Sequence, residues 1–301
     1  MAEIILFPGQ GAQYSGMARD LYENNSRAEN ILNEIFNELD FDLKSIMFEE
    51  DERLNKTEFT QPALFAHSLA VTASAGLQGD FLLGHSLGEL PALVHAGVLS
   101  LSDGVKIVQK RGELMSQSEG GKMAAVIGMD YQDLIELCEA VSDDSVKVSP
   151  ANINAPDQVV ISGDAEAVDD FSDRAKDHGA RRVMPLNVSG AFHSHLMKEA
   201  QDEFRTFLDD IEFKDAKIPV IQNVSARPET DGETIKKQLV DQITSPVRFV
   251  ECIETAVENG VTGGIEAGPK KVLNGLVRKI DKSISVKNID TLDQVKEYSD
   301  D

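Results

Sequence analysis

The stretch FLLGHSLG, from Phe81 to Gly88, decides the fold. A short apolar run leads directly into a Gly-x-Ser-x-Gly pentapeptide, and a helical pattern follows over residues 89–96. A strand, a sharp turn and a helix in this order are typical of a nucleophile elbow, which lifts a serine hydroxyl above a sheet while small glycines let neighbouring backbone approach. We therefore interpret Ser86 as a candidate nucleophile. The alternative is a chance Gly-Ser-Gly loop.

Short β-rich runs alternate with helical patterns on both sides of this stretch, which favours an α/β fold with a largely parallel sheet. The first predicted strand, residues 4–7, runs into the glycine-punctuated loop PGQG at residues 8–11. The carboxyl end of a parallel strand is where α/β sheets place their ligands. We expect an α/β-hydrolase-like large subdomain with a mainly parallel sheet that presents this loop and the elbow together.

The pattern changes between residues 123 and 189. Strands are predicted at 123–127, 146–152, 159–162 and 182–185, and helices at 131–141 and 165–178. This β-α-β-β-α-β order is ferredoxin-like, and its length suits an inserted lobe. We expect a large α/β catalytic subdomain of residues 1–122 and 190–301 and a ferredoxin-like small subdomain of residues 123–189. Further helices are predicted at 196–208, 234–242 and 249–258, and strands at 219–221 and 264–266.

Composition excludes several classes of protein. No apolar run approaches the roughly 18 residues of a membrane span, and residues 4–7 are too short for a signal peptide, so we expect a cytoplasmic protein without a membrane partner. The net charge of −23 argues against a nucleic-acid partner, because such binding needs a basic surface. Cys138 and Cys252 are far apart and lack metal-ligand neighbours, which predicts core thiols and no metal site.

A serine nucleophile needs a general base, and histidine is the usual one because its pKa lies near working pH. His193 and His195 lie in the loop SGAFHSH at residues 189–195, which opens a helical pattern. Spacing alone does not choose between them. The other four histidines are assigned to core packing or to a helix end: His67, His85, His95 and His178.

Arg111 lies in the predicted helix 103–117, which follows the elbow helix. A planar guanidinium near the elbow could clamp a substrate carboxylate with two parallel hydrogen bonds. The alternative is a surface arginine beside Lys110, and spacing alone favours that alternative.

Several further segments occur in a fixed order along the chain. They are FPGQGAQ at 7–13, GHSLGE at 84–89, Arg111, NINAP at 152–156, QVVISG at 158–163, AFHS at 191–194 and EAGP at 266–269. Together they resemble the malonyl-CoA:acyl carrier protein transacylases over nearly the whole chain. One departure is the lysine pair at 270–271, where glycine is frequent in that family.

The resemblance implies a role for each site residue. Ser86 is the acylated nucleophile, and His193 rather than His195 is its general base. The histidine is oriented by a backbone carbonyl near the SPVRF segment at 245–249, which we assign to Arg248. The remaining roles are an oxyanion hole formed by Gln10 with the backbone N–H of Leu87, a malonyl carboxylate receptor at Arg111 and substrate selectivity at Phe192.

The implied activity is transfer of the malonyl group from malonyl-CoA to the phosphopantetheine thiol of acyl carrier protein, supplying fatty-acid synthesis without a cofactor. The alternatives are an α/β-hydrolase-type thioesterase or esterase, a polyketide-associated acyltransferase and a non-catalytic carrier-docking module. Acyl carrier proteins are usually acidic, so an acidic enzyme needs a local cationic patch to bind one. The sequence predicts a docking patch that includes Arg181, Arg182, Lys270 and Lys271.

Overall fold

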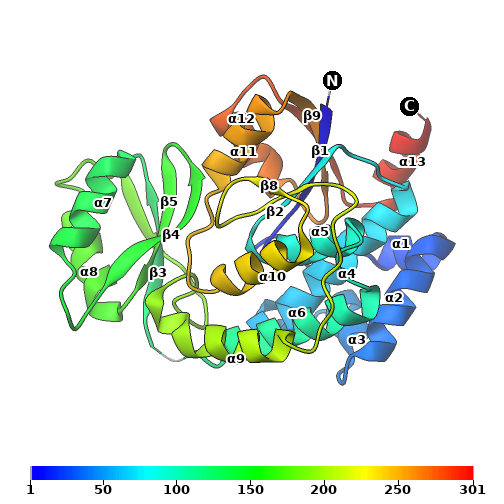
Figure 1. Cartoon of the computed structure of the whole chain (residues 1–301), viewed down its shortest axis with the longest axis horizontal. Coiled ribbons are helices and arrows are strands. Elements are labelled where there is room, and N and C mark those ends of the chain that lie inside the picture. The colour runs from blue at the N-terminus through cyan, green and yellow to red at the C-terminus, as the bar shows by residue number, and fades with distance from the viewer. Residues whose placement is uncertain (1, 119, 301) are drawn as a thin grey trace.

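The computed structural model describes residues 2–118 and 120–300, whose strands form two separate sheets (Figure 1). The larger sheet has the order β10-β9-β1-β2-β7-β8, in which only β8 is antiparallel to its neighbour. This confirms the expectation of a mainly parallel sheet. Its strands are β1 (Ala2–Phe7), β2 (Phe81–Gly84), β7 (Val220–Ile221), β8 (Pro228–Glu229), β9 (Val261–Ala267) and β10 (Ser285–Ile289).

Strand β1 shows why this sheet lies between two layers of helices. Ile5 and Phe7 belong to one core cluster, whereas Ile4 and Leu6 belong to the cluster on the other face. A parallel strand buried on both faces reads as a continuous apolar run, as residues 4–7 do. The register sets Phe7 of β1 beside Gly84 of β2, so the loop after β1 and the elbow after β2 leave the sheet at the same edge.

The helices that pack around the large sheet fall on either side of β2 in the chain. Before β2 these are α1 (Arg19–Asn24), α2 (Ser26–Glu38), α3 (Leu43–Phe48), η1 (Glu52–Asn55) and α4 (Thr57–Ala75). After β2 come η2 (Ser86–Gly88), α5 (Glu89–His95), α6 (Leu101–Ser116), η3 (His195–Met197), α9 (Lys198–Leu208), α10 (Gly232–Asp241), α11 (Phe249–Glu258), α12 (Val272–Ile280) and α13 (Leu292–Asp300). Helices α1, α2, α3, α12 and α13 and the edge strands β8 and β10 were not predicted from the sequence.

The smaller sheet is antiparallel and has the order β4-β5-β3-β6. Its elements are β3 (Lys122–Ile127), α7 (Tyr131–Ala140), β4 (Val148–Ala155), β5 (Gln158–Gly163), α8 (Ala165–Arg174) and β6 (Arg182–Pro185). This order confirms the ferredoxin-like prediction, and Figure 1 shows the sheet with α7 and α8 to one side of the large sheet. The unit has its own core cluster around Phe171. We propose on this basis the division into residues 1–122 with 190–301 and residues 123–189.

The two cysteines are buried and free, as predicted. Cys138 packs in the core of the small unit and Cys252 in one core of the large unit. None of the helices within residues 2–118 and 120–300 has the combination of length and hydropathy that crossing a bilayer requires.

Candidate active site

Ser86 lies at the sharp turn between β2 and α5. Its φ of +52° is in the left-handed region, which costs an L-residue about 1–2 kcal/mol. The two flanking glycines make the turn possible: a Cβ at Gly84 would lie 1.9 Å from the carbonyl carbon of Gly88, and one at Gly88 would lie 2.1 Å from the backbone oxygen of Phe7. The observed strand–turn–helix therefore has the geometry of the predicted elbow.

Two buried amide side chains hold this strained turn in place. The Oδ1 of Asn223 accepts a hydrogen bond from the Ser86 N–H at 2.7 Å, while its Nδ2 donates to the Gly84 carbonyl at 2.7 Å. The Nε2 of Gln242 donates to the Ser86 carbonyl at 3.1 Å. Both backbone groups of Ser86 are thus bonded, which fixes the direction of its hydroxyl.

His193 lies against that hydroxyl. Its Nε2 is 2.8 Å from the Oγ of Ser86, and its Nδ1 is 2.8 Å from the backbone oxygen of Gln242, the C-cap residue of α10. A carbonyl only accepts, so Nδ1 carries the proton and Nε2 presents a lone pair to the serine. Burial, together with the positive charge of Arg111, lowers the pKa of His193 to about 3. The imidazole is therefore neutral at pH 7.

The assignment of the orienting carbonyl to Arg248 is wrong. The carbonyl of Arg248 accepts from the N–H of Cys252, at 2.9 Å, as the first backbone acceptor of α11, so its position is set by that helix. Its guanidinium pairs with Glu251 and donates to the Val224 carbonyl at 3.1 Å. The orienting carbonyl belongs instead to Gln242, six positions earlier in the chain, and the backbone of Ser245 in the SPVRF segment also acts on the ring.

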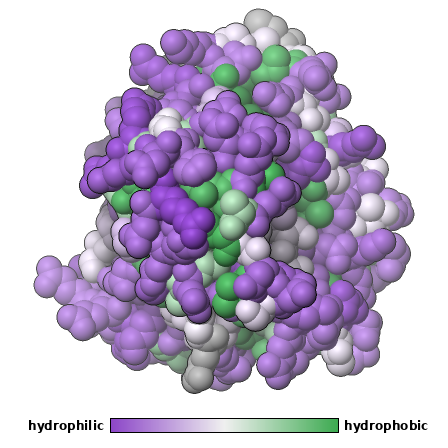
Figure 2. Space-filling view, turned by 90° about the vertical axis from the view of Figure 1, so that its left-hand side faces the viewer, coloured by the Kyte–Doolittle hydropathy of each residue, from purple (hydrophilic) through white to green (hydrophobic). Residues whose placement is uncertain are grey.

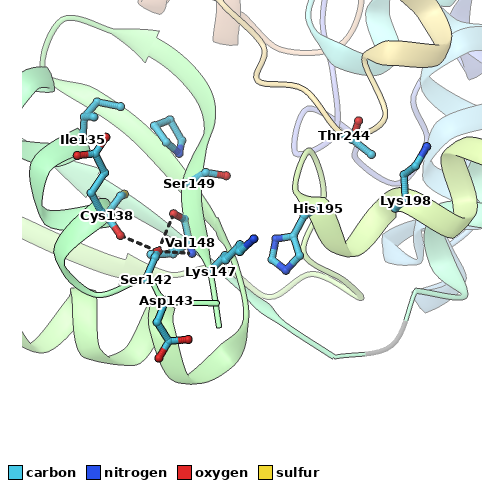
Figure 3. Close-up of a pocket in the computed structure, with 12 residues that line it drawn as sticks. Ile135, Cys138, Ser142, Asp143, Lys147, Val148, Ser149, His195, Lys198 and Thr244 are labelled. Carbon is cyan, nitrogen blue, oxygen red and sulfur yellow. Dashed lines mark hydrogen bonds between the residues drawn. The ribbon is translucent and has the colours of Figure 1, made fainter. Parts of the chain in front are cut away.

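His195 points away from Ser86. Its Nε2 pairs with Asp164 at 3.0 Å, and its side chain is 43% exposed. Figure 3 shows it at the edge of a cavity of about 880 Å³ between the small unit and α9, with Lys198 and Thr244 on the same side. The two histidines that spacing alone left as alternatives are therefore distinguished: of the two, His193 contacts the serine.

Arg111 is only 1% exposed, so the surface alternative is wrong. Its Nη2 donates to the Oγ of Ser86 at 3.1 Å and to the Oε1 of Gln242 at 2.9 Å, and its Nη1 donates to the Oε1 of Gln61 at 2.7 Å. Its buried Nε has no acceptor among the described residues. Burial lowers the pKa of Arg111 to about 10, so the guanidinium remains charged at neutral pH.

The loop after β1 packs closely on the elbow. A Cβ at Gly9 would lie 2.6 Å from the backbone oxygen of His85, so only glycine permits this approach. The side chain of Gln10 donates to the Oγ1 of Thr57 and accepts from Gln61, both at 3.3 Å. Leu87 follows Ser86 at the start of the helical segment, where backbone N–H groups lack a helical acceptor.

Phe192 immediately precedes His193 and is 6% exposed within the large core cluster. His193 itself adopts a φ of +58°, which turns the chain sharply after the ring. A Cβ at Gly190 would lie 3.5 Å from the ring of Phe192, so the ring and this glycine are close neighbours within the loop.

Sequence reasoning missed four buried polar residues of the site. They are Gln61, Glu89, Asn223 and Gln242. Glu89 ends the GHSLGE motif. Asn223 directly follows the predicted strand 219–221, at the carboxyl ends of the strands where the site lies. These positions mark both residues as candidates for the site. Gln61 and Gln242 belong to helical patterns in which nothing marks an inward polar side chain.

The face on the side of the small unit is mainly hydrophilic, and Figure 2 shows that hydrophobic residues gather near its middle. Within the site, the side chains of Arg111 and His193 are buried, whereas Ser86 is partly exposed.

A strained serine, a neutral buried imidazole and a buried guanidinium on one α/β scaffold are the features of an acyl-transfer site. The chain belongs to the acyl transferase domain family, whose family model matches residues 4–298.

Individual relatives and solved structures are similar to this chain over nearly its whole length. The chain is 49% identical to a malonyl CoA-acyl carrier protein transacylase of Staphylococcus aureus, over 98% of each chain, and 45% identical to one of Bacillus subtilis, over 96% of this chain and 94% of the other. A crystal structure of an acyl carrier protein S-malonyltransferase from Vibrio cholerae matches with a TM-score of 0.95 at 40% identity over 99% of each chain. A malonyl-transacylase in complex with its type II polyketide synthase carrier protein matches at 36% identity with the same TM-score, over 100% of this chain and 99% of that one.

Proposed function

We propose that this protein transfers the malonyl group of malonyl-CoA to the phosphopantetheine thiol of an acyl carrier protein through an acylated Ser86. The observation that carries the proposal is the meeting of three groups at one atom: the Oγ of Ser86 lies 2.8 Å from the His193 imidazole and 3.1 Å from the Arg111 guanidinium. A nucleophile, a base and a receptor for a carboxylate are thereby within reach of one acyl group. The names of the relatives support the same substrate and acceptor.

The first half-reaction starts with proton transfer. His193 takes the hydroxyl proton of Ser86 as the Oγ attacks the thioester carbonyl. When the tetrahedral intermediate collapses, the carbon–sulfur bond breaks, the imidazolium gives its proton to the leaving thiol, and the malonyl ester of Ser86 remains. The carrier thiol then attacks this ester, and the same steps run in reverse.

The oxyanion of that intermediate needs hydrogen-bond donors. In our proposal Gln10 and the backbone N–H of Leu87 supply them, because the loop after β1 and the elbow turn approach each other at the glycines. One such donor typically contributes about 100- to 1000-fold in rate.

Selectivity for malonyl follows from burial and shape. A buried guanidinium without a carboxylate partner is costly, so Arg111 favours malonyl over acetyl thioesters. The ring of Phe192, next to His193, leaves little room for an α-methyl branch, which disfavours methylmalonyl. Every group used in these steps is a side chain or a backbone amide, so the proposed chemistry needs no metal and no cofactor.

We place this activity in the cytoplasm and in the supply of fatty-acid synthesis. Two of the four residues of the predicted docking patch have partners within the protein. Arg181 pairs with Asp157, and the Nζ of Lys270 donates to the Gly11 carbonyl. The side chains of Arg182 and Lys271 have no such partner among the described residues, which leaves these two charges open for an acidic carrier.

Intact mass spectrometry after addition of malonyl-CoA tests the proposal. We expect a stable malonyl adduct that disappears rapidly only when a carrier protein bearing phosphopantetheine is added. Spontaneous loss of the adduct to water would instead identify a thioesterase or esterase, and failure to form any adduct would identify a non-catalytic docking module. Comparing carriers from fatty-acid and polyketide synthesis separates the two transferase roles.

A further inference from the structure

Glu89 is a buried carboxyl group for which the proposed mechanism has no use. It is 2% exposed and begins α5, directly below the elbow. One oxygen accepts the backbone N–H of Asn223 at 3.0 Å, and the other accepts the Nε2 of Gln242. Both partners only donate through these atoms, so the contacts favour a carboxylate.

The same two residues hold the catalytic groups. Asn223 accepts from the Ser86 N–H, and Gln242 offers its backbone oxygen to His193. The amide of Gln242 also joins two opposite charges, since its Nε2 donates to Glu89 while its Oε1 accepts from Arg111. Glu89 and Arg111 are thus joined through one amide, and they form a buried ion pair when Glu89 is ionised.

No carboxylate directly contacts Arg111 within residues 2–118 and 120–300. Its three hydrogen-bond acceptors, on Gln61, Gln242 and Ser86, are all neutral. Glu89 is the anionic group that acts on the charge of Arg111 in this part of the chain. A buried cation requires compensation, so this bridged pair stabilises the charge while no substrate is bound.

We propose that ionised Glu89 is the counter-charge of Arg111 at alkaline pH, and that binding of a substrate carboxylate at Arg111 makes this ionised Glu89 take up one proton from water. The inference rests on the proposed role of Arg111 as the malonyl receptor. A second carboxylate at one guanidinium would leave the buried site with an excess negative charge, and protonation of Glu89 removes it.

Glu89 ionises in a pH range in which this proton uptake can be measured. Burial raises its pKa to about 8, although the Asn223 N–H and the charge of Arg111 oppose the rise. Burial, together with the charge of Glu89, raises the pKa of the Cys252 thiol of α11 far above its ordinary value, so this thiol stays neutral.

The histidines around Glu89 do not compete for the proton. Burial lowers the pKa values of His85 before the elbow, His95 on α5 and His193, so these rings are neutral near pH 8. Arg111 keeps its proton as well, because its pKa is about 10. Glu89 is therefore the group of this site that changes charge near pH 8.

Proton uptake can be measured by titration calorimetry of the full-length Ser86→Ala variant, which binds thioesters without reacting. Malonyl-CoA and acetyl-CoA are titrated at pH 8 in two buffers with different ionisation enthalpies. The two ligands share every titrating group of coenzyme A, so their difference reports the carboxylate alone. We expect malonyl-CoA to bind more tightly and to take up a fraction of a proton more than acetyl-CoA, since Glu89 titrates in this range.

The pH dependence of the excess proton uptake tests whether Glu89 is the group that takes up the proton. The excess uptake should approach zero at pH 6.5, where Glu89 is already protonated, and should rise toward one proton at pH 9. Malonyl-CoA affinity should correspondingly weaken above pH 8. In the Ser86→Ala/Glu89→Gln double variant the excess should vanish at every pH.

The outcomes of these titrations separate the role of Glu89 from the proposed function. Tight malonyl-CoA binding without excess uptake, an uptake that does not vary with pH, or an uptake that persists with Gln at position 89 overturns the role of Glu89 and leaves the proposed function intact. Equal affinity for malonyl-CoA and acetyl-CoA removes the Arg111 receptor and this inference together. If the double variant does not fold, the pH series of Ser86→Ala alone decides.

Discussion

The Nε2 of His193 lies 2.8 Å from the Oγ of Ser86, although 107 positions separate the two residues in the chain. The contact needs both residues in left-handed backbone conformations, with φ of +58° and +52°. Two strained turns that face each other are stable only when the surrounding structure holds them, here through Asn223 and Gln242.

Replacing Ser86 by Ala removes the nucleophile without changing the packing of the elbow. We expect no malonyl adduct by intact mass spectrometry and no transfer to carrier protein. Ser283→Ala, at an exposed serine of another loop, is the matched control and should form the adduct normally. An adduct that survives in Ser86→Ala would place the acylated residue elsewhere.

His193→Ala and His195→Ala test the distinction between the two histidines. Loss of a general base typically slows a reaction by about 100- to 10,000-fold, and we expect a loss in this range at position 193. The change at position 195 should be small, because that ring pairs with Asp164 at a different cavity. Rapid-quench measurement of the acylation rate gives both numbers, and equal effects would contradict the observed geometry.

Arg111→Ala should abolish discrimination between malonyl-CoA and acetyl-CoA. Truncating a buried, hydrogen-bonded charge partner typically costs about 2–5 kcal/mol, so we expect kcat/KM for malonyl-CoA to fall by about 30- to 5,000-fold, while that for acetyl-CoA changes much less. Lys110→Ala, next to it on α6, controls for removal of one positive charge. Unchanged discrimination in Arg111→Ala would remove the receptor role.

The buried His193 should make the folded protein sensitive to acid. Its pKa is about 3 in the folded chain, below the ordinary value of 6.5, so the unfolded chain binds an extra proton between these pH values. Stability should therefore fall as pH drops through this window, by about 2 kcal/mol between pH 7 and pH 5 from this group. Urea unfolding of wild type and His193→Asn at the two pH values measures the difference. Equal losses in the two proteins would show that the ring is not buried in its neutral form.

Reversing the open charges of the docking patch should affect the carrier selectively. We expect Arg182→Glu with Lys271→Glu to raise the KM for carrier protein much more than the KM for malonyl-CoA, and more strongly at low salt. Lys176→Glu, at an exposed lysine after α8, is the net-charge control for each of the two reversals made singly. Proportionate changes in both KM values would refute the docking role.

The sequence predicted those parts of the fold whose signal is local. Residues 4–7 and the run before the elbow read as strands because both faces of a central parallel strand are apolar, and α11 matched its predicted range of 249–258 residue for residue. The six-residue helices α1 and α3 lack such a signal, whereas the amphipathic pattern of α2 was overlooked. The α1 helix, for example, has only Leu21 buried, so its periodicity is too weak to recognise.

The active site was predictable where a motif fixes the chemistry of one residue. The elbow alone indicated Ser86, whereas the choice of His193 and the role of Arg111 needed the family resemblance. Gln242 could not be predicted. Its backbone oxygen bonds to His193 and its side chain accepts from Arg111, but nothing in a helical pattern marks either role. The error at Arg248 has the same origin: which carbonyl faces an imidazole depends on where the preceding helix ends.

By itself, the amino-acid sequence determined the central strands of the large sheet, the small sheet and the nucleophile elbow, since apolar periodicity and glycine spacing act within a few residues of each other. Only the tertiary structure decided which carbonyl and which buried carboxyl complete the site. Those choices depend on contacts between residues 49 to 153 positions apart, and such contacts are set by packing and burial rather than by local pattern.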